Sequence, residues 1–340
     1  MIPQPIYDNL IRPLLFRFDP EAIHEVVMAG LKALSQFPYR PIQDPKLARK
    51  VFGLNFPNPV GLAAGMDKKG EAVPAWQTLG FGFVEIGTIT SLAQPGNPKP
   101  RIFRLPEMGG IINRMGFNND GADAVATRLE RLKATGFWPT IPVGINLGKS
   151  KVTPLEEATA DYLRSFDRLF ALGDYFVLNV SSPNTPGLRT LQGKTELNEL
   201  LGAVMAANRA KAEPKPLLLK IAPDLEFAQI EEILELVTSH GLAGLIATNT
   251  TLDHSCVPKE KDETGGLSGK PLRARSTEIV RFICERTKLP VIAVGGIFDA
   301  DAAMEKLDAG AALVQLYTGF IYRGPTLIRE ICDEVKRRAL

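Results

Sequence analysis

Cysteine and histidine are scarce in this chain of 340 residues. The three cysteines are odd in number and far apart, which argues against a disulfide framework or a CxxC metal motif and favours a reducing compartment. No two of the three histidines, His24, His240 and His254, have the spacing of a metal-ligand pair. We therefore expect no metal site, and any chemistry must depend on lysine, serine, asparagine or a cofactor.

Strong net charge and long apolar runs are also missing. The formal net charge is +2, too small to indicate a nucleic-acid partner, and none is expected. No stretch reaches the roughly 18 apolar residues of a membrane-spanning helix. Residues 1–16 lack the basic start of a secretory signal. We expect the protein in the cytoplasm or on a membrane that faces it.

Eight short apolar runs are present, and most of them end in small or polar residues. They begin at residues 58, 81, 142, 175, 216, 241, 290 and 312, with helix-like segments between them. Strands buried on both faces read as such continuous runs. Eight βα units predict an α/β fold, a (β/α)8 TIM barrel, with a doubly wound open sheet as the alternative. The two widest gaps predict insertions near residues 91–118 and 252–271.

The stretch "NVSSPNTPGLR" at residues 179–189 follows an apolar run that should form a core strand. Pro183 and Pro186 cannot continue that strand, because each lacks an N–H and has a fixed φ. An Asx- and Ser-rich turn is one interpretation. However, amides, hydroxyls or a lysine end nearly every predicted strand, and the catalytic groups of a TIM barrel lie at these ends. We therefore interpret the stretch as part of an active site.

Two strand ends indicate what this site binds. Gly295 and Gly296 follow the seventh strand, where TIM barrels commonly hold a phosphate, although a tight turn would also explain them. Lys220 lies in the apolar run "LLLKIAP" and needs a nearby anion if it is buried. A reduced flavin, which is negative near N1 and O2, would supply that anion. The alternative is an aspartate of a neighbouring strand, such as Asp67.

Several motifs together resemble the dihydroorotate dehydrogenases, the FMN enzymes of pyrimidine synthesis. They extend over essentially the whole chain in the expected order: "GLAAGMDKKG", "GFGFVEIGTIT", "PRIFRLPE", "INRMGFNNDG", "GINLGKS", "LNVSSPNTPGLR", "KIAPD", "GLIATNTT", "GGLSGKPL", "PVIAVGGI" and "LVQLYTGF". The catalytic base of that family is cysteine in the soluble class and serine in the membrane-associated, quinone-reducing class 2. The matching residue here is Ser182. The chain is therefore identified as similar to class 2.

The resemblance implies site residues, one position at a time. It implies FMN contacts from Ala64, Gly65, Met66, Asp67, Lys68, Thr88, Asn146, Asn179, Lys220, Thr248, Gly269, Gly296, Tyr317 and Thr318. It implies substrate contacts from Lys68, Asn113, Arg114, Met115, Gly116, Phe117, Asn179, Asn184, Asn249 and Thr250.

The implied reaction is the oxidation of (S)-dihydroorotate to orotate, with FMN as hydride acceptor and a quinone as final acceptor. It removes a proton from C5 and a hydride from C6, so the site needs a base. Ser182 is the candidate, with a proton relay through Thr185 or an ordered water; a simple turn hydroxyl is the alternative. The role of Arg189 stays open: it would either hold the loop in place or bind a ligand.

Residues 1–45 are expected to form a separate extension before a barrel of residues 46–340. Ile6, Leu10, Leu14 and Phe18 recur every four residues, and a second apolar stripe covers residues 23–34. Pro13 and the helix start "FDPEA" separate two short helices. We expect these helices to bind a quinone and to attach the protein peripherally to the cytoplasmic face of the inner membrane. The alternative is that the two helices only cap the barrel. His24 is interpreted as a surface histidine, with a place in a quinone tunnel as the alternative.

Other functions stay open at this point. A soluble dihydroorotate dehydrogenase would use another electron acceptor, and another FMN barrel would act on a pyrimidine or an isoprenoid. A barrel that only stores phosphate or flavin would not be an enzyme. The oligomeric state does not follow from the sequence, and a monomer is the working expectation. Deletion of residues 1–40 is expected to abolish quinone reduction and to leave the reaction with dihydroorotate intact.

Overall fold

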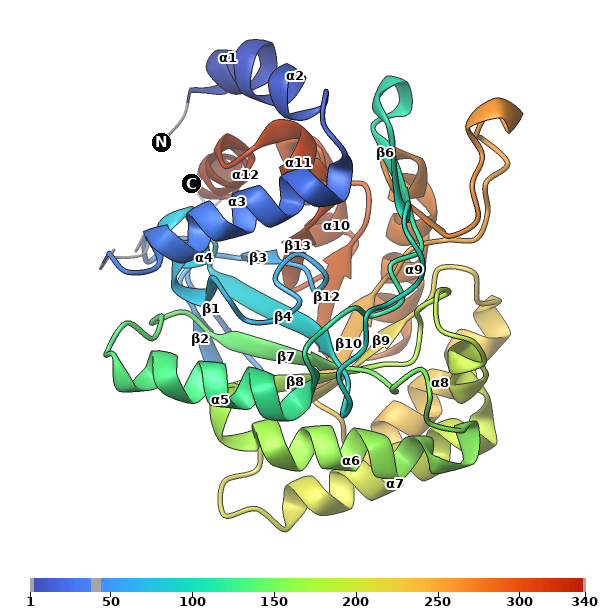
Figure 1. The fold of residues 1–340 in the computed structure, drawn as a ribbon. Coiled ribbons are helices and arrows are strands. Elements are labelled where there is room, and N and C mark those ends of the chain that lie inside the picture. The colour runs from blue at the N-terminus through green and yellow to red at the C-terminus, as the bar shows by residue number, and fades with distance from the viewer. Residues whose placement is uncertain (1–2, 38–43, 339–340) are drawn as a thin grey trace.

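Eight parallel strands close into a barrel in the computed structural model, which describes residues 3–37 and 44–338 (Figure 1). The strands are β3 (Val60–Leu62), β4 (Phe83–Ile89), β7 (Val143–Leu147), β8 (Tyr175–Asn179), β9 (Leu217–Ile221), β10 (Gly244–Ala247), β12 (Val291–Val294) and β13 (Leu313–Leu316). They follow one another around the barrel in this order, and β13 pairs with β3 to close it. The predicted (β/α)8 barrel is confirmed, and the doubly wound sheet is wrong.

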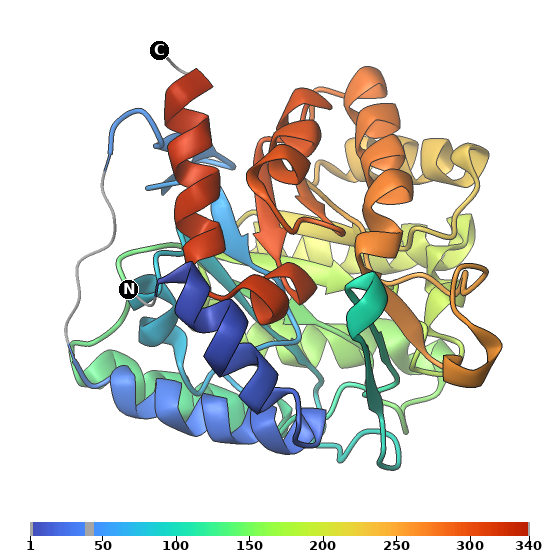
Figure 2. The ribbon, with the colours of Figure 1, turned by 90° about the horizontal axis from the view of Figure 1, so that it is seen from above.

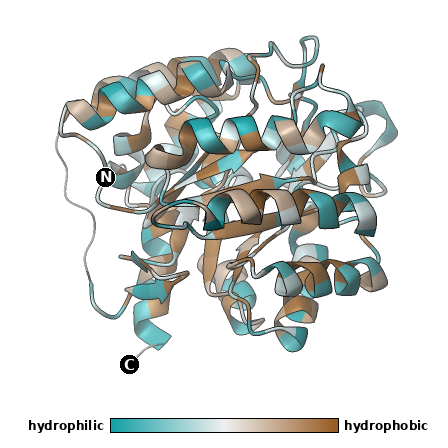
Figure 3. Ribbon diagram, turned by 90° about the horizontal axis from the view of Figure 1, so that it is seen from below, coloured by the Kyte–Doolittle hydropathy of each residue, from teal (hydrophilic) through white to brown (hydrophobic). Residues whose placement is uncertain are grey.

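Helices surround the barrel and cover its outer face. They are α4 (Val73–Thr78), α5 (Gly121–Ala134), α6 (Ala158–Leu169), α7 (Lys194–Arg209), α8 (Phe227–His240), α9 (Arg273–Arg286), α10 (Ala300–Asp308), α11 (Thr318–Arg323) and α12 (Thr326–Arg338). Figure 3 shows hydrophobic strands inside and helices that alternate hydrophobic and hydrophilic residues outside. This pattern is expected when each helix buries one face against the sheet.

The amino-terminal end of the barrel is filled by apolar side chains. A hairpin of β1 (Arg49–Val51) and β2 (Leu54–Phe56) precedes the first barrel strand. Phe56 of this hairpin packs edge-to-face on Phe83, with ring centroids 5.2 Å apart. Aromatic pairs in this geometry add stability beyond their buried area. The hairpin therefore packs against this end, and the cleft described below opens at the other.

The two predicted insertions meet in a small antiparallel sheet above the open end. It contains β5 (Ile102–Leu105), β6 (Gly110–Asn113) and β11 (Gly266–Gly269), in the order β11-β6-β5. Asn113 faces Gly266, and Gly110 faces Gly269. The insertions are confirmed, but the sequence did not predict that they pair with each other.

The N-terminal extension forms two helices. The first is built from α1 (Gln4–Ile6), the π-helical turn η1 (Tyr7–Ile11) and α2 (Arg12–Leu15), and the second is α3 (Pro20–Leu34). Pro13 lies inside the first helix rather than between the helices; because it has no N–H to donate, the preceding turn widens to a π-helix. Asp19 caps α3 by accepting hydrogen bonds from two main-chain amides, at 3.0 and 2.8 Å.

The first helix lies beside α11, as Figure 2 shows from above. Tyr7 donates a hydrogen bond to the carbonyl of Ile321 at 2.7 Å, and Arg12 donates to that of Tyr322 at 3.0 Å. Residues 38–43, which join the extension to the barrel, and residues 1–2 fall outside the described part of the chain. In residues 3–37 and 44–338, no helix is long and apolar enough to span a bilayer.

Candidate active site

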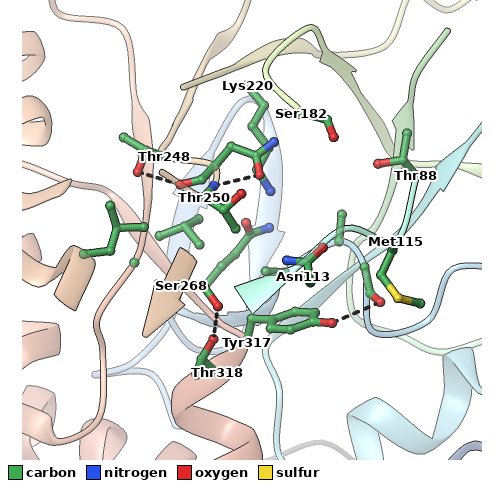
Figure 4. A pocket seen from close by; sticks show the side chains of 18 of the residues that line it. Thr88, Asn113, Met115, Ser182, Lys220, Thr248, Thr250, Ser268, Tyr317 and Thr318 are labelled. Carbon is green, nitrogen blue, oxygen red and sulfur yellow. Dashed lines mark hydrogen bonds between the residues drawn. The ribbon is translucent and has the colours of Figure 1, made fainter. Parts of the chain in front are cut away.

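The carboxyl ends of the barrel strands open into a cleft with an empty volume of about 1010 Å³ (Figure 4). Strands β8 and β9 bring Ser182 and Lys220 to one side, and Ser268, Tyr317 and Thr318 lie across from them. The cleft brings together these predicted residues: Ala64, Gly65, Lys68, Thr88, Asn113, Met115, Gly116, Phe117, Asn179, Ser182, Asn184, Lys220, Thr248, Asn249, Thr250, Gly269, Gly296, Tyr317 and Thr318.

Amides and one hydroxyl form a connected network along one wall. Asn179 donates to Thr88 Oγ1 at 3.0 Å and to Asn146 Oδ1 at 3.1 Å. Thr88 donates in turn to Asn146 Oδ1 at 2.6 Å, and Asn249 donates to Asn179 Oδ1 at 3.3 Å. The network fixes the orientation of each amide and leaves neutral donors and acceptors toward the cleft, which suits an uncharged ring with polar edges.

A buried carboxylate that the sequence analysis missed lies beneath this network. Glu85 of β4 accepts hydrogen bonds from Asn146 and from Gln315 of β13, each at 2.7 Å. Burial lowers the pKa of Lys220, and the negative charge of Glu85 opposes this shift. The acidic group that influences Lys220 is therefore Glu85 and not Asp67. A glutamate inside the otherwise apolar run "GFVEIG" was the signal in the sequence.

Asp67 turns away from the cleft and toward α4. It accepts hydrogen bonds from the amides of Glu71 and Ala72 at 2.8 and 3.0 Å, and from Trp76 Nε1 at 3.2 Å. The alternative in which Asp67 pairs with Lys220 is therefore wrong. Met66 precedes it and packs in the hydrophobic core.

Arg114 and Asn146 also do not line the cleft. The guanidinium of Arg114 donates to Glu263 at 2.8 Å and lies 4.5 Å from the centroid of the Phe103 ring. Asn146 lies one layer deeper than the lining residues and touches them through Thr88 and Asn179. For Met66, Asp67, Arg114 and Asn146, the roles that the resemblance implies stay predictions, without a side-chain position in the cleft to support them.

Two glycines at one end of the cleft permit a close approach of the backbone. Gly296 has a φ of +73°, and a Cβ there would lie 2.4 Å from Cα of Arg273. Gly269 has a φ of +101°, and a Cβ would lie 2.2 Å from the carbonyl oxygen of Gly109. Only glycine fits both positions. Next to them Ser268, which the sequence analysis missed, shares a hydrogen bond of 2.8 Å with Thr318.

Ser182 is in the loop between β8 and α7, and its buried hydroxyl lines the cleft. The hydroxyl accepts a hydrogen bond from the amide of Asn184 at 3.3 Å. Thr185, in the same loop, has a buried hydroxyl without a hydrogen-bonding partner among the described residues. No histidine is among the lining residues in the described part of the chain.

Arg189 clamps the same loop. It donates to the carbonyls of Ser181 and Thr250, both at 3.0 Å, and to the carboxylate of Asp224 at 2.7 Å. It is not among the lining residues. The structure therefore favours the clamp over the ligand group for this residue.

A second cleft lies between α3 and the loop after β3. Its empty volume is about 850 Å³, and it shares Lys68 and Met115 with the first cleft. Burial lowers the pKa of Lys68 to about 8 and, together with the nearby charge of Lys68, that of His24 to about 3. His24 is half-buried and lines this second cleft, which favours the alternative of a place in a cleft over an ordinary surface histidine.

Comparisons of the sequence and the fold with known proteins identify the family of this chain. The family model described as dihydroorotate dehydrogenase matches residues 46–339. The chain belongs to this family. It is 54% identical over 342 residues to the dihydroorotate dehydrogenase (quinone) of Gloeobacter violaceus, covering 97% of this chain and 94% of the relative.

A second relative and a solved structure give the same result. The dihydroorotate dehydrogenase (quinone) of Christiangramia forsetii is 50% identical over 346 residues, covering 98% of this chain and 100% of that one. A crystal structure of the Eimeria tenella DHODH in complex with ferulenol superposes with a TM-score of 0.86 at 41% identity. The match covers 93% of this chain and 90% of the solved chain. The similarity therefore includes the N-terminal extension as well as the barrel.

Proposed function

We propose that this chain oxidises (S)-dihydroorotate to orotate with FMN as its cofactor and a membrane quinone as the final electron acceptor. The observation that carries the proposal is the cleft lining, in which Ser182, Lys68 and a cluster of asparagine amides meet at the ends of the strands. The named relatives are quinone enzymes and have nearly the same length. The proposal divides the chain into an extension of residues 1–45 and a barrel of residues 46–340.

The residues present fit FMN. Thr88, Asn179 and Thr248 would hydrogen-bond the uncharged ring, and Lys220 would stabilise negative charge at its N1 and O2 edge. Gly269, Gly296 and Thr318 line one end of the cleft, where their main-chain N–H groups would hold the phosphate. When bound, FMN supplies the acceptor for two electrons from the substrate and the donor for the quinone.

The substrate end of the cleft offers paired donors and acceptors. Asn113, Asn184 and Asn249 would match the imide and carboxylate of dihydroorotate, and Lys68 would supply the positive charge that its carboxylate needs. Thr250 lines the cleft, and its buried hydroxyl has no hydrogen-bonding partner among the described residues. Thr250 is therefore free to bind the substrate.

Ser182 would act as the base and take the proton from C5. A serine hydroxyl is a weak base, so a second group must accept its own proton. The unpartnered hydroxyl of Thr185 supports a relay through that residue, directly or through water. The clamp of Arg189 would hold the loop in place while the proton moves.

The extension would attach the protein to the cytoplasmic face of the inner membrane and admit the quinone. The predicted stripe is exposed, with exposed fractions of 46%, 64% and 49% for Ile6, Leu10 and Leu14 of the first helix and 54% for Phe18 just after it. Two helices that only cap the barrel would have buried this stripe. The second cleft would give a quinone access beside α3, where neutral His24 can donate or accept a hydrogen bond.

Anaerobic mixing with dihydroorotate tests the proposal. The flavin-loaded protein should lose its yellow absorbance and regain it on addition of a water-soluble quinone. A barrel that only stores phosphate would bind no flavin and show no yellow absorbance. A flavin store would stay yellow, and so would an FMN barrel for another substrate. A protein that bleaches with dihydroorotate but passes its electrons to a soluble acceptor and not to a quinone would support the soluble alternative.

A further inference from the structure

Glu21 of α3 and Arg101 of the first insertion form a buried ion pair. Arg101 donates from Nε to one carboxylate oxygen at 3.0 Å and from Nη2 to the other at 2.7 Å. Their exposed fractions are 5% and 6%. A bidentate contact of this kind has a defined geometry, and a buried charge that loses its partner is strongly destabilising. Lys99 Nζ lies 3.4 Å from the same carboxylate. The pair therefore ties the extension firmly to the segment that precedes β5.

The same guanidinium also holds that segment in shape. Arg101 Nη1 donates to the carbonyls of Pro95 and Asn97, each at 2.7 Å. The carbonyl of Arg101 accepts the amide of Arg114 at 2.9 Å. Arg101 thus binds the extension through Nε and Nη2 of its guanidinium and the loop at 95–97 through Nη1.

Asn97 passes this contact on to the substrate end of the cleft. Its side chain donates to the carbonyl of Asn184 at 3.2 Å and to that of Arg114 at 3.0 Å. Its main-chain N–H donates to the carbonyl of Met115 at 3.0 Å. Asn184 donates in turn to the carbonyl of Asn113 at 3.0 Å. Three of these residues, Asn113, Met115 and Asn184, line the cleft.

We propose that Glu21 and Arg101 are positioning residues through which the N-terminal extension fixes the substrate end of the cleft. The identity of the substrate rests on the proposed function. The extension would then serve the reaction with dihydroorotate as well as the reaction with the quinone. Deletion of residues 1–40 would remove Glu21, take away the counter-charge of the Arg101 guanidinium, and fail to separate the two half-reactions.

Glu21 also acts on Lys68 through its charge. Burial lowers the pKa of Lys68 to about 8, and Glu21 is the strongest group that opposes this shift. The charged and titratable groups near Lys68, including those that line the second cleft with it, are Glu21, His24, Glu25, Lys32, Asp67, Lys69, Glu71 and Arg101. Loss of the Glu21 charge would lower the pKa of Lys68 further. Anion binding that needs protonated Lys68 would then fail at a lower pH than in the wild type.

The test compares Glu21→Gln with Glu130→Gln. Glu130 accepts a hydrogen bond from Arg168 at 2.7 Å, but this pair is exposed on α5 and α6 and has no contact with either cleft. Orotate binding to the flavin-loaded proteins is followed by calorimetry from pH 6 to 9. Glu21→Gln should raise the Kd about 10- to 100-fold, the effect expected when one hydrogen bond to a charged group is lost, and should shift the pH dependence downward. Glu130→Gln should bind within twofold of the wild type.

Glu21→Asp keeps the charge but withdraws the bidentate contact. It should show intermediate orotate affinity and the pH dependence of the wild type, which a loss of structure alone would not produce. If Glu21→Gln fails to fold, Glu21→Asp decides by its affinity. Wild-type affinity and pH dependence in the folded Glu21 variants, with a change only in quinone reduction, would overturn the proposal. A wild-type protein that binds orotate but is not bleached by dihydroorotate would instead refute the proposed function.

Discussion

Asn146 donates a hydrogen bond from Nδ2 to the buried carboxylate of Glu85 at 2.7 Å, and this contact decides which way its amide faces. With Nδ2 occupied, Oδ1 points to Thr88 and Asn179, which both donate to it. Glu85 also accepts from Gln315. A carboxylate beneath the cleft therefore sets the polarity of the amide network at the cleft wall.

Glu85→Gln should disturb this arrangement. The new amide offers one acceptor where two donors, from Asn146 and Gln315, now meet the carboxylate, so one buried donor loses its partner. We expect a loss of about 1–3 kcal/mol in the free energy of unfolding, measured by denaturant titration. Glu130→Gln, an exposed change of the same type, should stay within about 0.5 kcal/mol. Equal stability of the two variants would show that Glu85 does not organise the network.

Lys220→Met tests the charge next to the flavin. Lys220 has no ion pair among the described residues, and its ammonium reaches the cleft. The variant should retain less FMN, or hold it at a more negative midpoint potential, because reduced flavin loses its counter-charge. Lys149→Met is the control, since Lys149 is also buried but donates only to the carbonyls of Ser150 and Thr153. An unchanged potential at full occupancy would argue against this role.

Ser182→Ala tests the proposed base. The substitution removes only the hydroxyl, which makes one hydrogen bond of 3.3 Å, so FMN and orotate should still bind. Flavin reduction by dihydroorotate in anaerobic stopped flow should slow by about 10²–10⁴-fold. Thr185→Val should show a smaller loss, because water can replace that step of the relay. A rate within threefold of the wild type for Ser182→Ala would place the base elsewhere.

The ends of the strands could be predicted because each is marked by a few neighbouring residues in the sequence. Apolar runs of buried parallel strands stop at a proline, a glycine or an amide, and the fold brings all eight ends to one edge. Ser268 could not be predicted in the same way, since it reaches the cleft only through the pairing of β11 with β6. The contact of Glu21 with Arg101 could not be predicted either, because the two residues are 80 positions apart in the sequence and meet only in the folded chain.

The carried-over residues show a second limit. Arg114 lies beside cleft residues in the sequence, yet its side chain turns to Glu263 of the other insertion. Asp67 lies beside Lys68, yet it binds α4. A motif predicts the path of the backbone better than the direction of each side chain, because the direction depends on partners that are distant in the sequence.

Lys306 should make stability depend on pH. It is fully buried in α10 and donates to Ser276 and Thr277 at 2.9 and 2.7 Å. Burial lowers its pKa to about 7, against about 10.4 in an unfolded chain. Between these values the unfolded state binds more protons, so the stability contribution of this group rises with pH. Relative to Lys306→Met, the wild type should gain up to about 1.4 kcal/mol per pH unit from pH 7 to 9. Parallel profiles from denaturant titration would contradict this.

The exposed apolar stripe of the first helix gives the last prediction. Leu10 and Leu14 are 64% and 49% exposed, and they lie one helical turn apart on the face that points away from the barrel. In water such a stripe has no partner, whereas at a membrane surface it can enter the lipid. Replacing both residues by asparagine removes this apolar area and leaves the docking contact of Tyr7 with Ile321 in place.

Burial of apolar surface contributes about 25 cal/mol per Å², so each leucine should add roughly 1–2 kcal/mol to membrane binding. The double variant Leu10→Asn/Leu14→Asn should therefore bind lipid vesicles at least about 30-fold more weakly in co-sedimentation. Reduction of a long-chain quinone in vesicles should fall with it. Bleaching by dihydroorotate should not change, because neither residue contacts Glu21 or the cleft lining. The control changes Phe137 and Val152, which are exposed elsewhere, to asparagine. Equal vesicle binding by the two double variants would show that the stripe does not face the membrane.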